Sequence, residues 1–409
     1  MSVELRVLEA SEWDQWYEGL EQAFGGVRQA QEKRDLIKEL TDPARAIGAW
    51  DGSVSVGTAG SFGFDVTVPG GSAVRMAGVT EVSVASTHRR RGILTSMMRR
   101  QLDDLREWGE PLAILTASEP AIYGRFGYGT ASWQLVAEID TSRVRFPEPE
   151  RPDGITLRKV KPMDALDICE AIYARKVPER PGMIARLPGW EPLQIMDASE
   201  DKAGASDLQC VLAERDGETV GYTLFRNRPA WDNAGPKGSL QLTDLYALDP
   251  VAYAALWRFL AGIDLTSSIR MENRPVDDPW QHLVSDIRRC DARIWDGLYV
   301  RLVDVGTALA ARPYRTALDL VIEVEDAFCP WNEGRWRLSG DTKGAVCERT
   351  ADAADLVLSV RELGAAYMGG ISLAALAGAG RVREVREGAL TEASIAFGSD
   401  VAPWVPHNI

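Results

Sequence analysis

The chain has 409 residues, which is enough for two or three domains. Its 45% content of hydrophobic residues is ample for packed cores and argues against intrinsic disorder. The formal net charge of −14 argues against nucleic-acid binding, because an acidic surface repels phosphate backbones. The same charge suits a cationic small molecule, although acidic charge often serves solubility alone.

Cysteine and histidine usage indicates neither a disulfide framework nor a metal centre. The five cysteines include no CxxC pair, and the three histidines are far apart in the sequence. The first residues, Met1–Arg6, lack the apolar core of a signal peptide. The longest uncharged stretch, Gly364–Gly380, is too short and too rich in glycine for a membrane span. We therefore expect a cytoplasmic protein with no metal and no membrane span.

The first segment alternates helical and strand patterns. Polar helical stretches follow Trp13 and Gln29. Strands are predicted over residues 46–50, 54–64, 74–85 and 112–116, and a helix over residues 93–108. This order predicts an α/β domain around a mixed sheet.

A proline-rich linker, Arg145–Gly154, ends this segment, because its three prolines rule out a helix interior. The second segment weakly repeats the first. Asp51-Gly52 and Asp216-Gly217 are both hairpin signals, and Thr80-Glu81 has a later counterpart in Thr243-Asp244. A softer boundary near Asp291–Asp296 gives three predicted domains, over residues 1–150, 151–295 and 296–409.

The third segment combines strands and helices. Strands are predicted over residues 318–324, 336–338 and 355–360, and one helix over residues 363–376. This pattern predicts an α+β module. Gly378-Ala379-Gly380 begins a glycine-rich pattern but lacks a preceding strand, so we interpret it as a helix end or turn. The chain has no Gly-Lys dipeptide and hence no P-loop.

The stretch Val79–Thr95 carries the clearest chemistry. Thr80, Val82 and Val84 alternate as in a half-buried strand, and the period then changes to that of a helix. One helical face contains Leu94, Met97, Met98, Leu102 and Leu105. The arginines at 89–91 thus precede a helix N-terminus, where a cation costs ~0.3–1 kcal/mol. Three arginines alone would suggest a solvated loop, but this arrangement favours an anion, such as a pyrophosphate, held by the arginines and the helix amides.

These residues resemble the acetyl-CoA-binding motif of the GNAT superfamily, with Arg89 in its first position and Gly92 as its glycine. Leu94 departs from the Gly or Ala that usually ends the motif. Arg-Arg-Arg-Gly followed by two aliphatic residues is similar to the variant in the Eis (enhanced intracellular survival) family of N-acetyltransferases. The predicted cofactor-binding residues of this stretch are Val82, Ser83, Val84, Arg89, Arg90, Arg91, Gly92, Ile93, Leu94 and Thr95.

A second stretch, Thr116–Gly129, also resembles the Eis family. The resemblance implies that Ser118 and Glu119 contact acetyl-CoA and that Tyr123 is the general acid. Tyr128 is the competing tyrosine, which we expect to pack in the core. Taken alone, the stretch would equally suit a glycine-rich aromatic turn.

The resemblance covers nearly the whole chain and implies tandem GNAT domains, a C-terminal sterol-carrier-like domain and a homo-hexamer. The second GNAT domain would lack a working cofactor site, since Asp249–Tyr253 stands where the arginine loop would be. The family pattern also makes the C-terminal carboxylate, here that of Ile409, the general base. The tail before it is apolar and stiffened by proline, which favours docking.

The expected function is acetyl-CoA-dependent N-acetylation of a primary amine. The family suggests aminoglycosides and lysine side chains as acceptors, and the sequence does not choose between them. The alternative is a lipid- or partner-binding scaffold with a vestigial acetyl-CoA site. The intact Arg89–Gly92 loop argues against that alternative.

Overall fold

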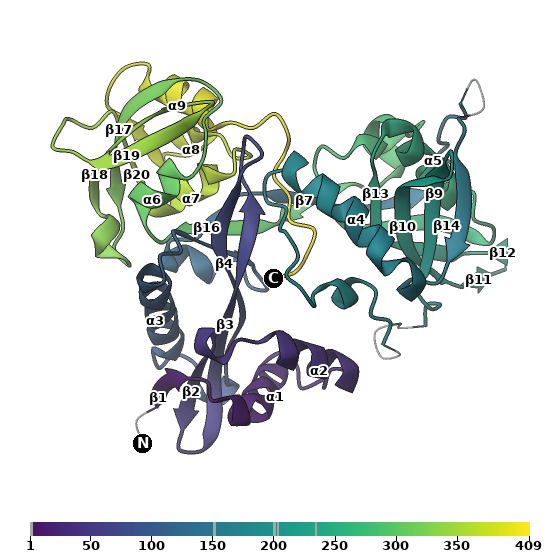
Figure 1. The fold of residues 1–409 in the computed structure, drawn as a ribbon, viewed down its shortest axis with the longest axis horizontal. Coiled ribbons are helices and arrows are strands. Elements are labelled where there is room, and N and C mark those ends of the chain that lie inside the picture. The colour runs from purple at the N-terminus through teal and green to yellow at the C-terminus, as the bar shows by residue number, and fades with distance from the viewer. Residues whose placement is uncertain (1–2, 150–152, 199–201, 203, 234) are drawn as a thin grey trace. The chain divides into compact units, whose positions relative to one another are not determined.

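The computed structural model describes residues 3–149, 153–198, 202, 204–233 and 235–409 (Figure 1). They form two compact units. The described residues within 3–132, 180–185 and 296–409 make up the first unit, and those within 133–179 and 186–295 make up the second. The predicted boundary between residues 150 and 151 lies outside the described residues.

A mixed seven-stranded sheet organises the first unit, in the order β1-β2-β3-β4-β5-β16-β6. Its strands are β1 Glu4–Val7, β2 Ile47–Asp51, β3 Val54–Thr67, β4 Ala73–Val84, β5 Leu112–Thr116, β6 Gly129–Thr130 and β16 Leu298–Leu302. The predicted hairpin at Asp51-Gly52 joins β2 to β3, and Gly52 takes a positive φ of 62° there. Strand β16 comes from the third predicted segment and lies between β5 and β6.

The helices of this part are α1 Trp13–Ala23, α2 Gln31–Leu40 and α3 Ile93–Glu107. Helix α3 buries the apolar face expected from the sequence, including Met97, Met98, Leu102 and Leu105. Burying each such side chain contributes about 1.5–3 kcal/mol. The packing of this apolar face therefore holds α3 in place. Leu94, at the open end of the same face, is only partly buried.

Two irregularities interrupt the sheet beside the start of α3. Parallel strands β4 and β5 pair only at Ala77 with Ala113 and Gly78 with Ile114. A β-bulge then shifts the β3–β4 register where Glu81 has a φ of 56°. Val82 and Val84 pack against one core as predicted. The prediction that Thr80 shares their face is wrong, because the bulge lies between Thr80 and Val82 and changes the face on which the following side chains lie.

The second unit contains another mixed seven-stranded sheet, in the order β15-β7-β14-β13-β10-β9-β8. Its strands are β7 Trp133–Asp140, β8 Thr156–Val160, β9 Gln209–Arg215, β10 Glu218–Arg228, β13 Gly238–Ala247, β14 Thr266–Pro275 and β15 Arg293–Asp296. The predicted Asp216-Gly217 hairpin joins β9 to β10. Two short strands, β11 Trp231–Asp232 and β12 Gly235–Pro236, pair separately, and the helices are α4 Leu166–Lys176 and α5 Pro250–Ala261.

The C-terminal part of the first unit is an α+β module with the sheet order β19-β18-β17-β20-β21. Its strands are β17 Leu318–Glu325, β18 Gly334–Asp341, β19 Gly344–Arg349, β20 Leu356–Ser359 and β21 Val382–Glu384. Its helices are α6 Val305–Ala310, α7 Val360–Tyr367, α8 Leu373–Gly378 and α9 Ala389–Phe397.

The single helix predicted over residues 363–376 is wrong, because α7 ends at Tyr367 and α8 starts at Leu373. Gly369 separates them with a φ of 78°, and a Cβ there would lie 2.8 Å from the Phe397 carbonyl oxygen. Gly378 ends α8, as expected for a helix terminus. All five cysteines are buried and unpaired. Within the described residues, no helix is long and apolar enough to cross a membrane.

Candidate active site

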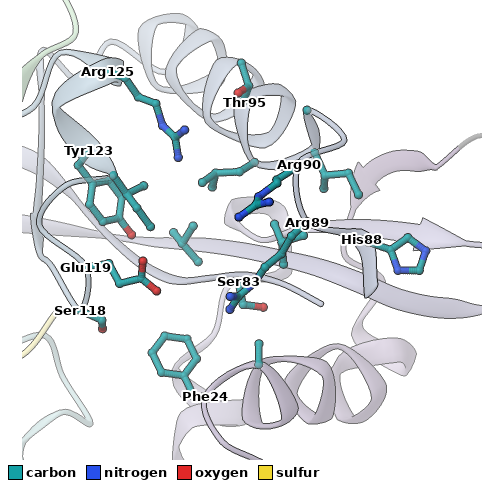
Figure 2. A pocket seen from close by; sticks show the side chains of 17 residues that line it. Phe24, Ser83, His88, Arg89, Arg90, Thr95, Ser118, Glu119, Tyr123 and Arg125 are labelled. Atoms are coloured by element: carbon teal, nitrogen blue, oxygen red, sulfur yellow. The ribbon is translucent and has the colours of Figure 1, made fainter. Parts of the chain in front are cut away.

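A pocket of about 600 Å³ opens in the first unit between the start of α3 and the residues after β5. Its size falls in the usual range for small-molecule sites. It is lined by Ala23, Phe24, Val82, Ser83, Val84, His88, Arg89, Arg90, Gly92, Ile93, Leu94, Thr95, Ser118, Glu119, Ile122, Tyr123 and Arg125 (Figure 2). The pocket arises because β4 and β5 separate after Gly78. Beyond that residue, β4 has no neighbouring strand on its β5 side, so its backbone groups there are left unpaired.

One end of the pocket is the N-terminus of α3. Gly92 occupies the N-cap position with a left-handed φ of 82° and supplies no side chain to cap the helix amides. The first amides of a helix have no partner within the helix, so those of Ile93–Thr95 are available to a ligand. Arg89 and Arg90 line the pocket beside them (Figure 2). Free amides, the positive end of the helix dipole and two guanidinium groups together suit a phosphate-bearing molecule.

Arg91 is the one predicted cofactor-binding residue of this loop that does not line the pocket. Its Nη2 donates to the Thr87 carbonyl oxygen at 2.9 Å, which braces the loop from outside. His88 also helps to brace the loop, because its Nε2 lies 3.3 Å from the Asp51 carboxylate of the β2–β3 hairpin.

Ser118, Glu119 and Tyr123 form the opposite wall. They follow β5, and Tyr123 begins a short 3₁₀ helix that ends at Phe126. The Tyr123 hydroxyl and the Glu119 carboxylate both point toward the pocket (Figure 2). Burial, together with the nearby Glu119 charge, raises the pKa of Tyr123 to about 12. The phenol therefore keeps its proton at neutral pH.

Tyr128 has different surroundings. It is completely buried in the core, packs edge-on against Tyr123 with ring centroids 5.8 Å apart, and does not line the pocket. Its hydroxyl has no hydrogen-bond partner among the described residues. Burial raises its pKa far above the ordinary value. The structure thus places Tyr128 in the packing position expected from the sequence.

The C-terminal tail docks within the first unit. The backbone N–H of Trp404 donates to the Pro181 carbonyl oxygen at 2.8 Å, and Trp404 and Val405 are buried. The Ile409 N–H donates to Thr116 Oγ1 at 3.3 Å, at the end of β5. A Cβ on Gly78 would lie 2.8 Å from Ile409 Cγ2, so the tail ends where β4 and β5 separate. Ile409 itself does not line the pocket.

Sequence reasoning missed five lining residues: Ala23, Phe24, His88, Ile122 and Arg125. Ala23 is the last residue of α1 and Phe24 follows it, so the fold brings the end of this helix to the pocket. Phe24 is 58% exposed although it is a large aromatic side chain, but one sequence gives no sign of that exposure. Among the described residues, no group of three or more His, Cys, Asp or Glu side chains is arranged to hold a metal ion.

Comparison with known protein families divides the chain into three matched parts. Residues 4–131 and 182–302 each match an acetyltransferase (GNAT) domain family. Residues 305–406 match a sterol carrier protein domain family. The tandem GNAT domains and the sterol-carrier-like domain expected from the sequence are therefore present.

Whole-chain relatives are similar throughout. An uncharacterized N-acetyltransferase from Streptomyces avermitilis is 64% identical over 408 residues, covering 100% of both chains. The N-acetyltransferase Eis of Mycobacterium tuberculosis is 34% identical over 389 residues, covering 92% of each chain. The crystal structure of Eis1 from Mycobacterium abscessus superposes with a TM-score of 0.83 at 32% identity over 100% of both chains. This chain is an N-acetyltransferase that belongs to the Eis-type family of the GNAT superfamily.

Proposed function

We propose that this enzyme transfers an acetyl group from acetyl-CoA, the co-substrate of GNAT acetyltransferases, to a primary amine. The observation that carries the proposal is the uncapped N-terminus of α3, which opens with Arg89 and Arg90 into a pocket that extends to Tyr123. A scaffold with a vestigial site would have no need to keep this helix end free.

The lining residues fit acetyl-CoA chemically. The amides of Ile93–Thr95 and the guanidinium groups of Arg89 and Arg90 would hold the pyrophosphate. Ser118 and Glu119 line the same pocket and would contact the pantetheine arm. Beyond Gly78, β4 backbone groups that β5 leaves unpaired would meet the rest of this arm, and an N–H among Val82–Val84 would polarise the acetyl carbonyl.

Tyr123 would act as the general acid. During transfer, a bond forms between the amine nitrogen and the acetyl carbon, and the bond from that carbon to sulfur breaks. The Tyr123 hydroxyl would donate its proton to the departing sulfur, and water would restore the phenol. Its position in the pocket wall supports this role.

The Ile409 carboxylate would accept the proton that the amine loses. A terminal carboxylate has an ordinary pKa of about 3.3–3.7, so it is ionised at neutral pH but is a weak base toward an ammonium. Positioning must therefore do much of the work, through a water if the distance requires one. The docked tail beside Thr116 and Gly78 supports this placement.

The arginine loop provides a direct test with a matched control. We expect Arg89→Ala combined with Arg90→Ala to weaken acetyl-CoA binding about 10- to 100-fold, because charge-assisted contacts are lost. Arg91→Ala removes the same kind of side chain from outside the pocket and should leave the affinity within about twofold. Isothermal titration with acetyl-CoA measures both. Unchanged affinity in the double variant would overturn the proposed binding mode.

The acceptor and the assembly state are also proposals. The family resemblance suggests aminoglycoside-like amines or lysine side chains, a homo-hexamer and a cytoplasmic location. An amine panel read by release of free CoA thiol identifies the acceptor class. Light scattering that gives a monomer at micromolar concentration would contradict the hexamer.

A further inference from the structure

Glu81 occupies an unusual backbone position. In the β3–β4 pairing, Thr58 lies opposite Ser83 and Gly60 lies opposite Thr80, so Ala59 alone faces the bulge residues Glu81 and Val82. Glu81 takes a φ of 56°, a conformation that costs a non-glycine residue about 1–2 kcal/mol. Bulges often re-aim a side chain next to an active site.

The bulge aims the Glu81 carboxyl across β3. Its Oε2 lies 2.6 Å from the position that a Cβ on residue 60 would take, so the side chain uses space that only a glycine leaves open. Ala59 and Val79 pack in the cores that contain the α3 methionines. Side chains of neighbouring strand residues point to opposite faces of a sheet. Gly60 and Gly78, which are next to Ala59 and Val79, therefore lie on the face of the sheet that points away from α3.

The terminal residue lies over that same face, where Ile409 Cγ2 and the Phe64 ring both lie above Gly78. Gly60 pairs with Thr80, so Gly60 and Gly78 are diagonal neighbours across the two strands. Diagonal positions in an antiparallel pair are about 7–8 Å apart. The Glu81 carboxyl above Gly60 and the chain terminus above Gly78 therefore lie at neighbouring positions on one face of the sheet.

The Glu81 carboxyl has no cationic partner in the part of the chain that the structure describes. Among the described residues no charge or hydrogen bond stabilises its ionised form, and burial raises its pKa to about 8. Glu21 on α1, by contrast, is buried in a hydrogen-bonded pair with Arg34 on α2. Tyr17 on α1 also lies in this neighbourhood, since the charges of Glu81 and Glu21 help to raise its pKa. A part-buried carboxyl without a partner is costly to ionise unless a ligand supplies the opposite charge.

We propose that Glu81 binds a second ammonium group of the acceptor while the amine to be acetylated lies at the Ile409 carboxylate. The enzyme is then selective for acceptors that carry at least two amino groups several ångströms apart. This inference rests on the proposed acetyltransferase reaction at the Tyr123 pocket and names its specificity-determining residue.

Steady-state kinetics with α,ω-diamines and monoamines of matching chain length test the proposal. Glu81→Gln keeps the shape and removes the charge, so KM for diamines should rise about 10- to 100-fold with kcat nearly unchanged. KM for monoamines and the affinity for acetyl-CoA should not change. Glu107→Gln, at the exposed end of α3, is the control for loss of a carboxylate and should behave as wild type.

The pH dependence provides a second readout. Diamine KM should fall as the pH rises through about 8, because the wild-type carboxyl ionises there, whereas Glu81→Gln should lack this step. Tyr17 stays protonated in this range, so it does not produce the step.

The alternatives give different results. Equal KM changes for diamines and monoamines, a loss of kcat alone, or no change would each overturn the role of Glu81. Wild-type enzyme that binds no acetyl-CoA would overturn the proposed function as well. Wild-type enzyme that acetylates monoamines as well as it does diamines would overturn only the selectivity.

Discussion

The N-termini of α3 and α5 show how two GNAT sheets of one chain differ. Helix α3 begins after Gly92, which leaves its amides open to the pocket. Helix α5 begins after Asp249, whose carboxylate accepts hydrogen bonds from the amides of Val251 and Ala252 at 2.9 and 3.0 Å. Arg215 pairs with the same carboxylate at 2.9 Å. In the second sheet, the chain's own side chain therefore caps the first amides of the helix.

The central strands separate in both sheets. Strands β4 and β5 form parallel pairs only at Ala77 and Gly78. Strands β13 and β14 pair from Gly238 to Leu242, and β13 then runs on to Ala247 without pairing to β14. Strand separation therefore does not distinguish the two sheets, whereas the helix N-termini do.

The second sheet also has a β-bulge, where the β10–β13 register shifts after the pair of Leu224 with Asp244, and the carboxyl groups at the two bulges differ. Asp244 of β13 accepts a hydrogen bond from the Tyr222 hydroxyl at 2.9 Å. Burial raises the pKa of Asp244, while the nearby charges of Arg186 and Arg274 oppose that shift. Glu81 has no such partner among the described residues. The second sheet thus supplies internal partners for groups that the first leaves to ligands, and we expect only the first to bind acetyl-CoA.

The largest expected effect comes from the tyrosine in the open pocket. Tyr123→Phe keeps the ring and removes the proton, so kcat should fall about 100-fold or more with little change in stability. Tyr128→Phe is the matched control, because its hydroxyl has no partner among the described residues. Stopped assays of CoA thiol release measure both variants. A large fall in kcat for Tyr128→Phe, together with a normal kcat for Tyr123→Phe, would show that the roles are reversed.

A smaller effect is expected from the chain terminus. Amidation of Ile409, introduced by peptide ligation, removes the charge and preserves the shape. We expect kcat to fall about 10- to 100-fold, less than for Tyr123→Phe, because water can accept part of the amine proton. Acetyl-CoA affinity should survive, since the arginine loop is separate from the tail. Full activity of the amidated enzyme would mean that the tail only packs and that another group is the base.

The smallest effect is expected from the Asp249 cap of α5 in the second sheet. Asp249→Ala removes the α5 cap and the Arg215 pair, so the free energy of unfolding should drop by about 1–2 kcal/mol in urea titrations. Catalysis and acetyl-CoA affinity should stay as in wild type. Asp264→Ala, an exposed carboxylate after α5, controls for the loss of charge. A change in acetyl-CoA affinity for Asp249→Ala alone would contradict the assignment of one site to the first sheet.

Local patterns made the α3 end of the pocket predictable. The switch in period at Gly92, the cations before it and the apolar face of the following helix all depend on short-range geometry. The likeness of Ser118, Glu119 and Tyr123 to a known family then located the opposite wall, and all three line the pocket. Their roles remain predictions.

Long-range pairing could not be predicted. Periodicity identifies a strand but not its neighbours, so nothing in Leu298–Leu302 indicates that this strand joins the first sheet between β5 and β6. Glu81 was overlooked because a polar residue between Thr80 and Val82 suits ordinary strand alternation. Only the positive φ of the bulge turns its carboxyl over Gly60. The break at Gly369 was missed because local apolar spacing continues through it.

The number of acetyl-CoA molecules bound per chain tests the central claim most directly. Isothermal titration of the full-length enzyme should give one site per chain, which is lost or weakened about 10- to 100-fold in the Arg89→Ala, Arg90→Ala variant. The same site should remain intact in Asp249→Ala. Two sites per chain, or one site that survives the arginine substitutions and responds to Asp249→Ala, would contradict the account.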